Sequence, residues 1–319
     1  MVAVLADLVQ RGGKRLRPAL TIASYRACSV GSAEGTSSRE IPSEKALLDA
    51  ACAWEFLQLY FLVQDDWMDG DVTRRGGPAV HVKLTEFHNG DRHLGACGAV
   101  LAGDLACAFA HQVLVGIDAP ADLVREALVL FSRVHRDVIL GQSLDLALPG
   151  DEPKWLDRLH ALKTGSYTVQ GPVELGAILA RAPSELRRRL KRFSYALGLA
   201  FQLRDDVLGT FGDPTKTGKP VGSDLRNRKR TSLVVEAIER AGVGESARLE
   251  RIMSTEKTDG AEIGWAVEFM RSCGALDAVE ERIAMLCNDS KAVLVDAPIT
   301  PEGAEQLGGL ADLLSHRDA

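Results

Sequence analysis

The chain has 319 residues, 46% of them hydrophobic and 26% charged, and its 38 Lys and Arg against 44 Asp and Glu give a net charge of −6. These proportions are typical of a globular protein and exclude a disordered, collagen-like or fibrous coiled-coil chain. The acidic balance argues against nucleic-acid binding and against a polybasic membrane anchor, because both need an excess or a stripe of Lys and Arg.

The N-terminal sequence MVAVLADLVQRGGKRLRP lacks the basic start, long apolar core and cleavage site of a signal peptide. No uninterrupted apolar run reaches the roughly 18 residues of a membrane span, so no membrane span is predicted. The 6 cysteines are scattered, without a C-x-x-C pair. We therefore expect reduced thiols in a cytoplasmic protein, not a disulfide or zinc framework.

Helical periodicity runs through most of the chain, with apolar residues at steps of three and four after a break at Pro42 and a predicted N-cap at Ser43. Strand signals are scarce. Further helical runs are predicted over about 94–114, 121–146, 155–182, 185–208, 231–242, 261–288 and 303–315. The predicted separators are 31–43, 70–79, 116–120, 149–153 and a polar segment at 209–230. We predict one all-α domain, residues 1–319, of about ten helices.

The first informative segment is FLVQDDWMDGDVTRRGGP, residues 61–78. Asp65 and Asp69 are four apart, so on a helix they share one face, and Asp66 lies about 100° around the axis. Carboxylates so close together repel one another unless a cation lies between them, and Mg²⁺ is a hard cation that prefers such oxygen ligands. The alternative for this segment alone is an exposed acidic helix end.

A second pair recurs in FQLRDDVLGTFGDP, where Asp205 and Asp206 follow another apolar helical run. Two helices that end in paired carboxylates can face each other across a cavity in a helical bundle. An apolar cavity with carboxylates at its mouth predicts a substrate that is apolar at one end and anionic at the other.

Basic residues accompany both acidic segments. Arg binds phosphate through a bidentate fork and Lys binds it as a point charge, so clusters of both beside metal candidates indicate a phosphate-bearing substrate. The clusters are Lys14, Arg15 and Arg17 in GGKRLRP; Arg74 and Arg75; and Lys163 beside Thr164, Lys219 and Lys229.

These segments, taken in order, closely resemble the trans-isoprenyl diphosphate synthases, also called polyprenyl synthetases. The resemblance runs through GGKRLRP (12–18), ExxQ (55–58), DDWMDGDVTRRGGP (65–78), GQSLD (141–145), KTG (163–165), FQLRDD (201–206), GKP (218–220) and KRT (229–231). It implies an all-helical isoprenoid-synthase fold around a deep central cavity, normally in a homodimer. The implied reaction is the Mg²⁺-dependent, head-to-tail condensation of isopentenyl diphosphate with an allylic diphosphate.

The resemblance also implies roles for individual residues. Asp65, Asp69 and Asp205 would bind three Mg²⁺ ions, for which Mn²⁺ can substitute, with Asp66 and Asp206 in support. The isopentenyl diphosphate site would comprise Lys14, Arg17, Gln58 and Arg75. The allylic diphosphate site would comprise Arg74, Lys163, Thr164, Gln202, Lys219 and Lys229, with Thr164 and Gln202 also stabilising a carbocation by their dipoles.

Product length in this family is set by the cavity floor. At 1.5 Å per residue, Tyr60 and Phe61 lie about 6–8 Å deeper than Asp65 along the helix. Large rings there predict an early stop, and we favour a C15 product over C10 and C20. The alternative is that both rings pack as ordinary core.

Three departures from the family pattern stand out. Gly209 replaces the third Asp of the second motif, and Asp213 would lie near the same face as Asp205 if the helix continued. Gln64 replaces the usual His before the first pair. Only 11 residues precede GGKRLRP, which predicts an N-terminal helix that is short or missing relative to the family.

Two other functions share part of this pattern. A class I terpene cyclase shares the metal-triggered ionisation but needs no isopentenyl site, which the set of Lys14, Arg17, Gln58 and Arg75 provides. A non-catalytic subunit of a heteromeric synthase is disfavoured because both acidic pairs are present, although Gly209 and the short N-terminus keep that alternative open.

Overall fold

The structure is a computed structural model that describes residues 1–29, 42–146, 153–217 and 220–316. Helices dominate these residues, and their only strands form a two-residue hairpin, β1 (Thr73–Arg74) antiparallel to β2 (Gly77–Pro78). The all-α prediction is therefore confirmed. Contacts divide the chain into two compact units, residues 1–131 with 174–182, and residues 132–173 with 183–319.

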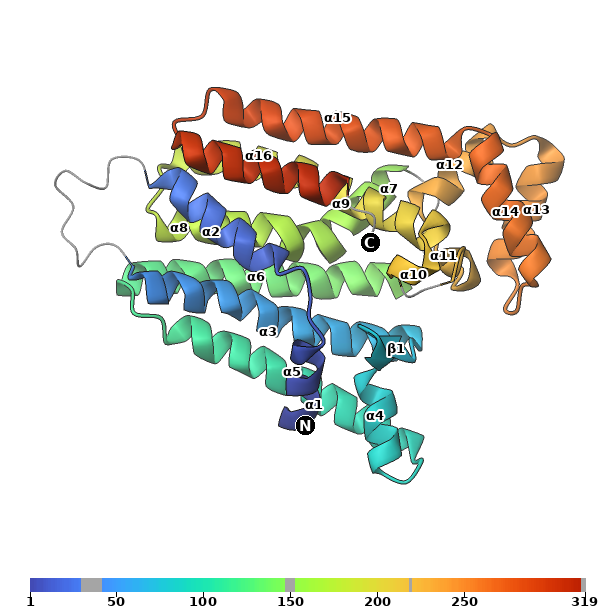
Figure 1. Ribbon diagram of the computed structural model, residues 1–319, viewed down its shortest axis with the longest axis horizontal. Helices are drawn as coiled ribbons and strands as arrows, with labels where there is room; N and C mark the ends of the chain where they lie inside the picture. The colour runs from blue at the N-terminus through green and yellow to red at the C-terminus, as the bar shows by residue number, and fades with distance from the viewer. Residues whose placement is uncertain (30–41, 147–152, 218–219, 317–319) are drawn as a thin grey trace. The chain divides into compact units, whose positions relative to one another are not determined.

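The first unit contains α1 (Val2–Gln10), α2 (Leu16–Cys28), α3 (Glu44–Asp69), α4 (Val80–Phe87) and α5 (Arg92–Val115). Helix α3 begins as predicted, because the side chain of Ser43 accepts a hydrogen bond from the backbone N of Ala46. Helices α3 and α5 lie side by side (Figure 1). Small residues on α5 allow this close approach, since a Cβ atom at Gly103 would lie 3.0 Å from Nε2 of Gln64.

The core of the first unit lies between α1, α3, α4 and α5. Its buried members include Leu8, Val63, Leu84 and Ala102. Burying a side chain such as Leu8, which is 2% exposed, contributes about 1.5–3 kcal/mol. This apolar packing fixes the C-terminal half of α3, which ends in the first aspartate motif.

The second unit is larger, and α6 and α8 contribute residues to both units. Its elements are α6 (Ala121–Leu146), α7 (Pro153–His160), the π-helix η1 (Ala161–Gln170), α8 (Gly171–Leu179), α9 (Ser184–Phe211), α10 (Pro214–Thr217), α11 (Ser223–Arg226), α12 (Ser232–Arg240), α13 (Val243–Ser254), α14 (Gly260–Ser272), α15 (Ala275–Val295) and α16 (Pro301–Ser315). Helices α9 and α15 pack along each other.

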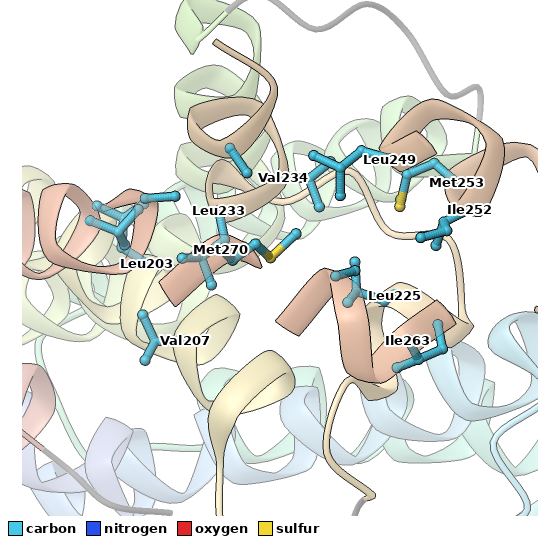
Figure 2. Packing of buried hydrophobic residues seen from close by; sticks show 14 of the residues in the cluster. Leu203, Val207, Leu225, Leu233, Val234, Leu249, Ile252, Met253, Ile263 and Met270 are labelled. Carbon is cyan, nitrogen blue, oxygen red and sulfur yellow. The ribbon is translucent and has the colours of Figure 1, made fainter. Parts of the chain in front are cut away.

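An apolar cluster joins α9 to the elements that follow it. Figure 2 shows side chains from α9, α11, α12, α13 and α14 meeting around Met270, which is fully buried. The short helix α11 is anchored there by Leu225, which is 1% exposed. Residues 220–230, which the sequence predicts as part of a polar loop, therefore pack against the end of α9 through α11.

Several element boundaries differ from the sequence prediction. The run predicted over 261–288 divides into α14 and α15, because Gly274 has a φ of 79° that a continuous right-handed helix does not allow. Helices α1, α2, α4 and α13 and the hairpin lie outside the predicted runs. The described residues form more helices than the ten predicted. Two of the additional helices, α10 and α11, are single turns, and the predicted run 155–182 divides into α7, η1 and α8.

Two helices, α3 and α5, are long and apolar enough to cross a membrane by length and composition alone. Half of the apolar window of α3 and a third of that of α5 are buried inside the protein. Core helices commonly meet the same criterion, so the expected absence of a membrane span stays a prediction.

Candidate active site

The first aspartate motif occupies the last two turns of α3. The helix ends at Asp69, and Gly70 takes the left-handed conformation with a φ of 70°. Asp65 and Asp69 are half-buried, whereas Asp66 is buried. The partial negative charge at a helix C-terminus disfavours carboxylates. This end of α3 is therefore unfavourable for three of them without a compensating cation.

Asp66 receives that compensation from Arg74 in the hairpin. The Nε of Arg74 donates to Oδ1 of Asp66 at 2.7 Å, and its Nη2 donates to Asp71 at 3.3 Å. Asp66 is 1% exposed, and this burial raises its pKa to about 6 although the guanidinium of Arg74 opposes the rise. Its Oδ2 is buried and has no hydrogen-bond partner among the described residues.

The hairpin that carries Arg74 and Arg75 is held by the end of α1. Arg75 and Gly76 have φ values of 52° and 71°, and positive values at both central residues characterise the type I′ turn of a two-residue hairpin loop. Nη1 of Arg11 donates to the carbonyl oxygens of Arg74 at 3.1 Å and Pro78 at 2.8 Å. Helix α1 thus fixes the guanidinium that binds Asp66.

A cluster of guanidinium groups surrounds the segment after α1. Gly13 has a φ of 147°, which L side chains rarely adopt, and a Cβ atom there would lie 3.0 Å from Nη2 of Arg75, so glycine favours this close approach. Burial lowers the pKa of Arg75, and the nearby charges of Arg15, Arg17 and Arg74 lower it further. Cations that disfavour one another's charge provide a ready site for an anion.

The remaining residues of the predicted isopentenyl diphosphate site belong to the same unit. Lys14 is exposed and Arg17 is 7% exposed. Arg15 forms an ion pair with Glu55 of α3, and Gln58 lies one turn further along that face of α3. The four predicted residues therefore come from the segment before α2, the first turn of α2, the middle of α3 and the hairpin.

Tyr60 and Phe61 lie side by side on α3, with ring centroids 5.0 Å apart and tilted by 54°. Tyr60 packs against the core of the first unit, and a Cβ atom at Gly103 of α5 would lie 3.4 Å from Cδ2 of its ring. Both side chains are half-buried, but only Tyr60 packs against that cluster and so has the core contacts that the alternative interpretation describes.

The second aspartate motif lies within α9, not at its end, because the helix continues to Phe211. Asp205 is half-buried and Asp206 is 3% exposed. Nε2 of Gln202 donates to Oδ1 of Asp206 at 2.9 Å, and the backbone N of Ser232 donates to its Oδ2 at 3.3 Å. Ser232 is the first residue of α12, so Asp206 lies at a helix N-terminus, where negative charge is favoured.

Lys163 and Thr164 lie on the π-helix, which packs tightly against its neighbours. A Cβ atom at Gly141 of α6 would lie 2.4 Å from the backbone N of Lys163, and one at Gly198 of α9 would lie 3.0 Å from Cα of Gly165. Nζ of Lys163 pairs with Asp145 at 2.5 Å. Single π-helical turns inside α-helical runs are often found at functional sites.

Lys229 follows α9 in the chain and belongs to the same unit as the second aspartate motif. The backbone N of Lys229 donates to the carbonyl oxygen of Asp224 at 2.8 Å. Lys219 lies outside the described residues. Asp213 does not continue the face of Asp205, because α9 ends at Phe211 and the Asp213 side chain accepts hydrogen bonds from Thr215. The helical geometry on which a role for Asp213 depended is thus not present.

Sequence reasoning missed several residues that hold these groups. Arg11 supports the hairpin and Asp145 pairs with Lys163. Nε2 of His160 lies 3.7 Å from Asp206, and both side chains are buried. Of these residues, only Asp145 had a sequence signal for a functional role, because it lies within GQSLD. Arg11 and His160 had no such signal, because their contacts are with residues distant in the chain.

The donor set fits Mg²⁺. Both motifs offer carboxylate oxygens, which this ion prefers, and Oδ2 of Asp66 is a buried oxygen without a hydrogen-bond partner among the described residues. Across the described ranges, no three His, Cys, Asp or Glu side chains converge as a cluster that could hold a metal by itself. Mg²⁺ usually takes one or two carboxylates, with waters and substrate phosphates completing its coordination.

Comparisons with known proteins agree on one protein family. A model of the polyprenyl synthetase family matches residues 1–270. The chain is 31% identical over 318 residues to the geranylfarnesyl diphosphate synthase of Aeropyrum pernix, covering 97% of this chain and 92% of that protein. It is 32% identical over 280 residues to the farnesyl diphosphate synthase of Geobacillus stearothermophilus, covering 83% and 86%.

A solved structure shares the fold. The geranylgeranyl pyrophosphate synthase of Corynebacterium glutamicum, complexed with isoprenyl diphosphate and magnesium, matches with a TM-score of 0.91 at 33% identity. The match covers 99% of this chain and 90% of that chain.

Proposed function

The chain belongs to the polyprenyl synthetase family and is a trans-prenyltransferase, and we propose that it condenses isopentenyl diphosphate with a C5 or C10 allylic diphosphate. One observation carries this proposal. In an acidic protein, the guanidinium groups of Arg15, Arg17, Arg74 and Arg75 form one cluster, and Arg74 pairs with Asp66 at the end of α3. Such an arrangement suits a diphosphate bound next to a metal site.

In this proposal the guanidinium cluster, with Lys14 and Gln58, binds isopentenyl diphosphate. Arg75 is already held before binding, because its Nη1 donates to the carbonyl oxygen of Leu8 at 3.2 Å and the type I′ turn sets its backbone. Preorganised cations stabilise charge without the cost of reorienting during the reaction. Arg74 acts differently, since it pairs with Asp66 and so holds the first metal motif.

In this proposal Asp65 and Asp69 of the first motif and Asp205 of the second would hold Mg²⁺, while Lys163, Lys219 and Lys229 would bind the phosphate oxygens of the allylic diphosphate. Mg²⁺, when bound, supplies charge neutralisation of the leaving diphosphate. Asp66 and Asp206 orient their helices, because both are buried and bound by neighbouring side chains or backbone.

The proposed reaction needs no reactant other than the two diphosphates. The allylic C–O bond breaks and its electron pair leaves with the diphosphate, which produces an allylic carbocation. The dipoles of Thr164 and Gln202 stabilise that cation. The isopentenyl double bond attacks it, a new C–C bond forms, and the departed diphosphate removes a proton. An apolar cavity would exclude the water that otherwise traps the cation.

We propose a C15 product. The support is the pair of rings at Tyr60 and Phe61, about one turn or more deeper than Asp65 and in mutual contact. The names of the relatives span C15, C20 and C25 products, so family membership alone leaves product length open. Phe61 is the better candidate for the stop, because Tyr60 packs into the core between α3 and α5.

We also propose that the protein forms a homodimer. Leu94 and Leu101 lie seven residues apart on one face of α5 and are 43% and 54% exposed. Exposed leucines on one helix face are a common feature of subunit interfaces. Light scattering coupled to gel filtration would give twice the 34.4 kDa of the chain, and a monomer at micromolar concentration would contradict it.

The test of function is direct. The purified protein is incubated with Mg²⁺, isopentenyl diphosphate and, separately, C5, C10 and C15 allylic diphosphates, and the products are sized. Products ending at C15 support the full proposal. Longer products keep the reaction but reject the aromatic stop, which Phe61→Ala and Tyr60→Ala then test separately. Hydrocarbon from an allylic substrate alone indicates a cyclase, and no turnover indicates a subunit that needs a partner.

A further inference from the structure

The second aspartate motif lacks its third carboxylate in sequence. Gly209 stands four residues after Asp205, and both positions belong to the continuous helix α9. Residues four apart on a helix share a face, with their Cβ atoms about 5–6 Å apart. A side chain at position 209 would therefore lie one turn further along the face of α9 that carries Asp205.

The space for that side chain is already filled by a carboxylate from another segment. A Cβ atom at Gly209 would lie 2.0 Å from Oδ2, 2.4 Å from Cγ and 2.8 Å from Oδ1 of Asp224. Contacts under 3.0 Å essentially do not occur, so any larger residue at 209 requires Asp224 to move. Only glycine permits the observed position of this carboxylate.

Asp224 is held in this position by the residues on either side. The hydroxyl of Ser223 donates to the carbonyl oxygen of Gly209 at 3.0 Å, and Leu225 is buried in the apolar cluster of Figure 2. The backbone N of Gly222 also donates to the carbonyl oxygen of Thr210 at 3.0 Å. Helix α11 is thus fastened to the last turn of α9 just before Asp224, and the residue just after Asp224 is buried.

We propose that Asp224 supplies the third carboxylate of the second aspartate motif from outside the helix, and so helps to bind the magnesium–diphosphate group together with Asp205. This inference rests on the proposed function. It explains why glycine stands at position 209, because the missing side chain and the inserted carboxylate are two parts of one arrangement. The motif is then complete in three dimensions although it is incomplete in sequence.

The test moves the carboxylate between positions 224 and 209. Asp224→Asn keeps the shape of the side chain and removes its charge. Asp224→Gly removes the carboxylate, Gly209→Asp adds one on the helix, and the double variant Gly209→Asp with Asp224→Gly moves the carboxylate from the loop to the helix. Asp289→Asn is the matched control, because Asp289 is exposed on α15 of the same unit. The readout is the rise in melting temperature during a Mg²⁺ titration with inorganic pyrophosphate.

We expect Asp224→Asn and Asp224→Gly to raise the Mg²⁺ concentration at half-maximal stabilisation about 10–100-fold, the usual cost of removing a group that supports a metal site. Gly209→Asp alone should lower the metal-free melting temperature, because its side chain overlaps Asp224. The double variant should recover both the metal-free melting temperature and most of the Mg²⁺ response. Asp289→Asn should match the original protein.

Two outcomes would overturn the inference. One is an unchanged Mg²⁺ response in Asp224→Asn. The other is a double variant that responds no better than Asp224→Gly. The same variants separate the inference from the function. If the protein makes prenyl diphosphates while Asp224→Asn responds normally, only the role of Asp224 fails. If it binds Mg²⁺ and pyrophosphate through Asp224 but condenses nothing, the proposed function fails.

Discussion

The two aspartate motifs share an Asp pair four residues after a Phe but have different surroundings. In both, the second Asp is the buried one, with exposures of 1% for Asp66 and 3% for Asp206, whereas Asp65 and Asp205 are half-buried. Asp66 lies at the negative end of its own helix and pairs with a guanidinium, Arg74. Asp206 lies at the positive end of α12 and receives hydrogen bonds from an amide side chain and a backbone N.

The two Asp residues of each pair therefore have different roles. The buried Asp anchors its helix to the segment that follows, while the half-buried Asp remains accessible to a metal and a diphosphate. The electrostatic field at the helix end determines which kind of partner the buried carboxylate needs. A carboxylate at a helix C-terminus needs a full positive charge, whereas one at a helix N-terminus is stabilised by backbone dipoles and neutral donors.

The largest effect should come from the half-buried members. Asp65→Asn and Asp205→Asn should each lower kcat by about 10²–10³-fold, the range for losing one preorganised electrostatic contact. Their melting temperatures without Mg²⁺ should change little, because neither residue is the buried anchor. Steady-state kinetics and a thermal melt, with Asp289→Asn alongside, check this expectation. A collapse in stability without a kinetic defect would reverse the assigned roles.

The sequence predicted both motifs and the helices that bear them, because helical spacing and paired carboxylates are local signals. It also predicted the basic residues near the first motif. It did not separate Asp65 from Asp66, since burial depends on the position of the hairpin. The contacts of Arg11, His160 and Asp224 join positions that are distant in the chain or lie in a segment without strong periodicity.

The next largest effect concerns the charged anchor. Arg74→Ala leaves Asp66 as a buried carboxylate without its cation, and breaking such a pair costs about 3–5 kcal/mol. Arg74→Lys should cost less, because one charge is kept although the fork is lost. Arg136→Ala is the matched control, since Arg136 makes an exposed pair with Asp137 and should change stability by about 0.5 kcal/mol or less. Urea unfolding measures all three, and equal losses at positions 74 and 136 would refute the anchor.

The pH dependence of stability should reflect Asp66. Its pKa is about 6 in the folded protein against an ordinary value of 3.8. Between these pH values the folded protein binds a proton that the unfolded chain does not. Asp66 therefore adds stability as the pH falls from 7 towards 4, and this contribution is lost as the pH rises through about 6. The shift corresponds to about 2–3 kcal/mol.

Asp66→Asn isolates this contribution, because it removes the titrating group and keeps an oxygen that Arg74 can bind. The difference in unfolding free energy between the original protein and this variant should change in favour of the original protein on acidification from pH 7 to pH 4. The other carboxylates are common to both proteins and cancel in the difference. A difference that is flat with pH would show that Asp66 titrates near its ordinary value in the folded state.

The smallest effect is expected at the neutral anchor of Asp206. Gln202→Ala removes one donor, whose hydrogen bond at 2.9 Å to a carboxylate is worth about 1.5–3 kcal/mol. The backbone N of Ser232 remains as a second donor, so the loss should lie at the low end of that range and below the loss for Arg74→Ala. Urea unfolding of the two variants gives this ranking. If Gln202→Ala were the more destabilising, the field of α12 would be too weak to hold Asp206, and the contrast between a charged anchor on α3 and a dipolar anchor on α9 would be wrong.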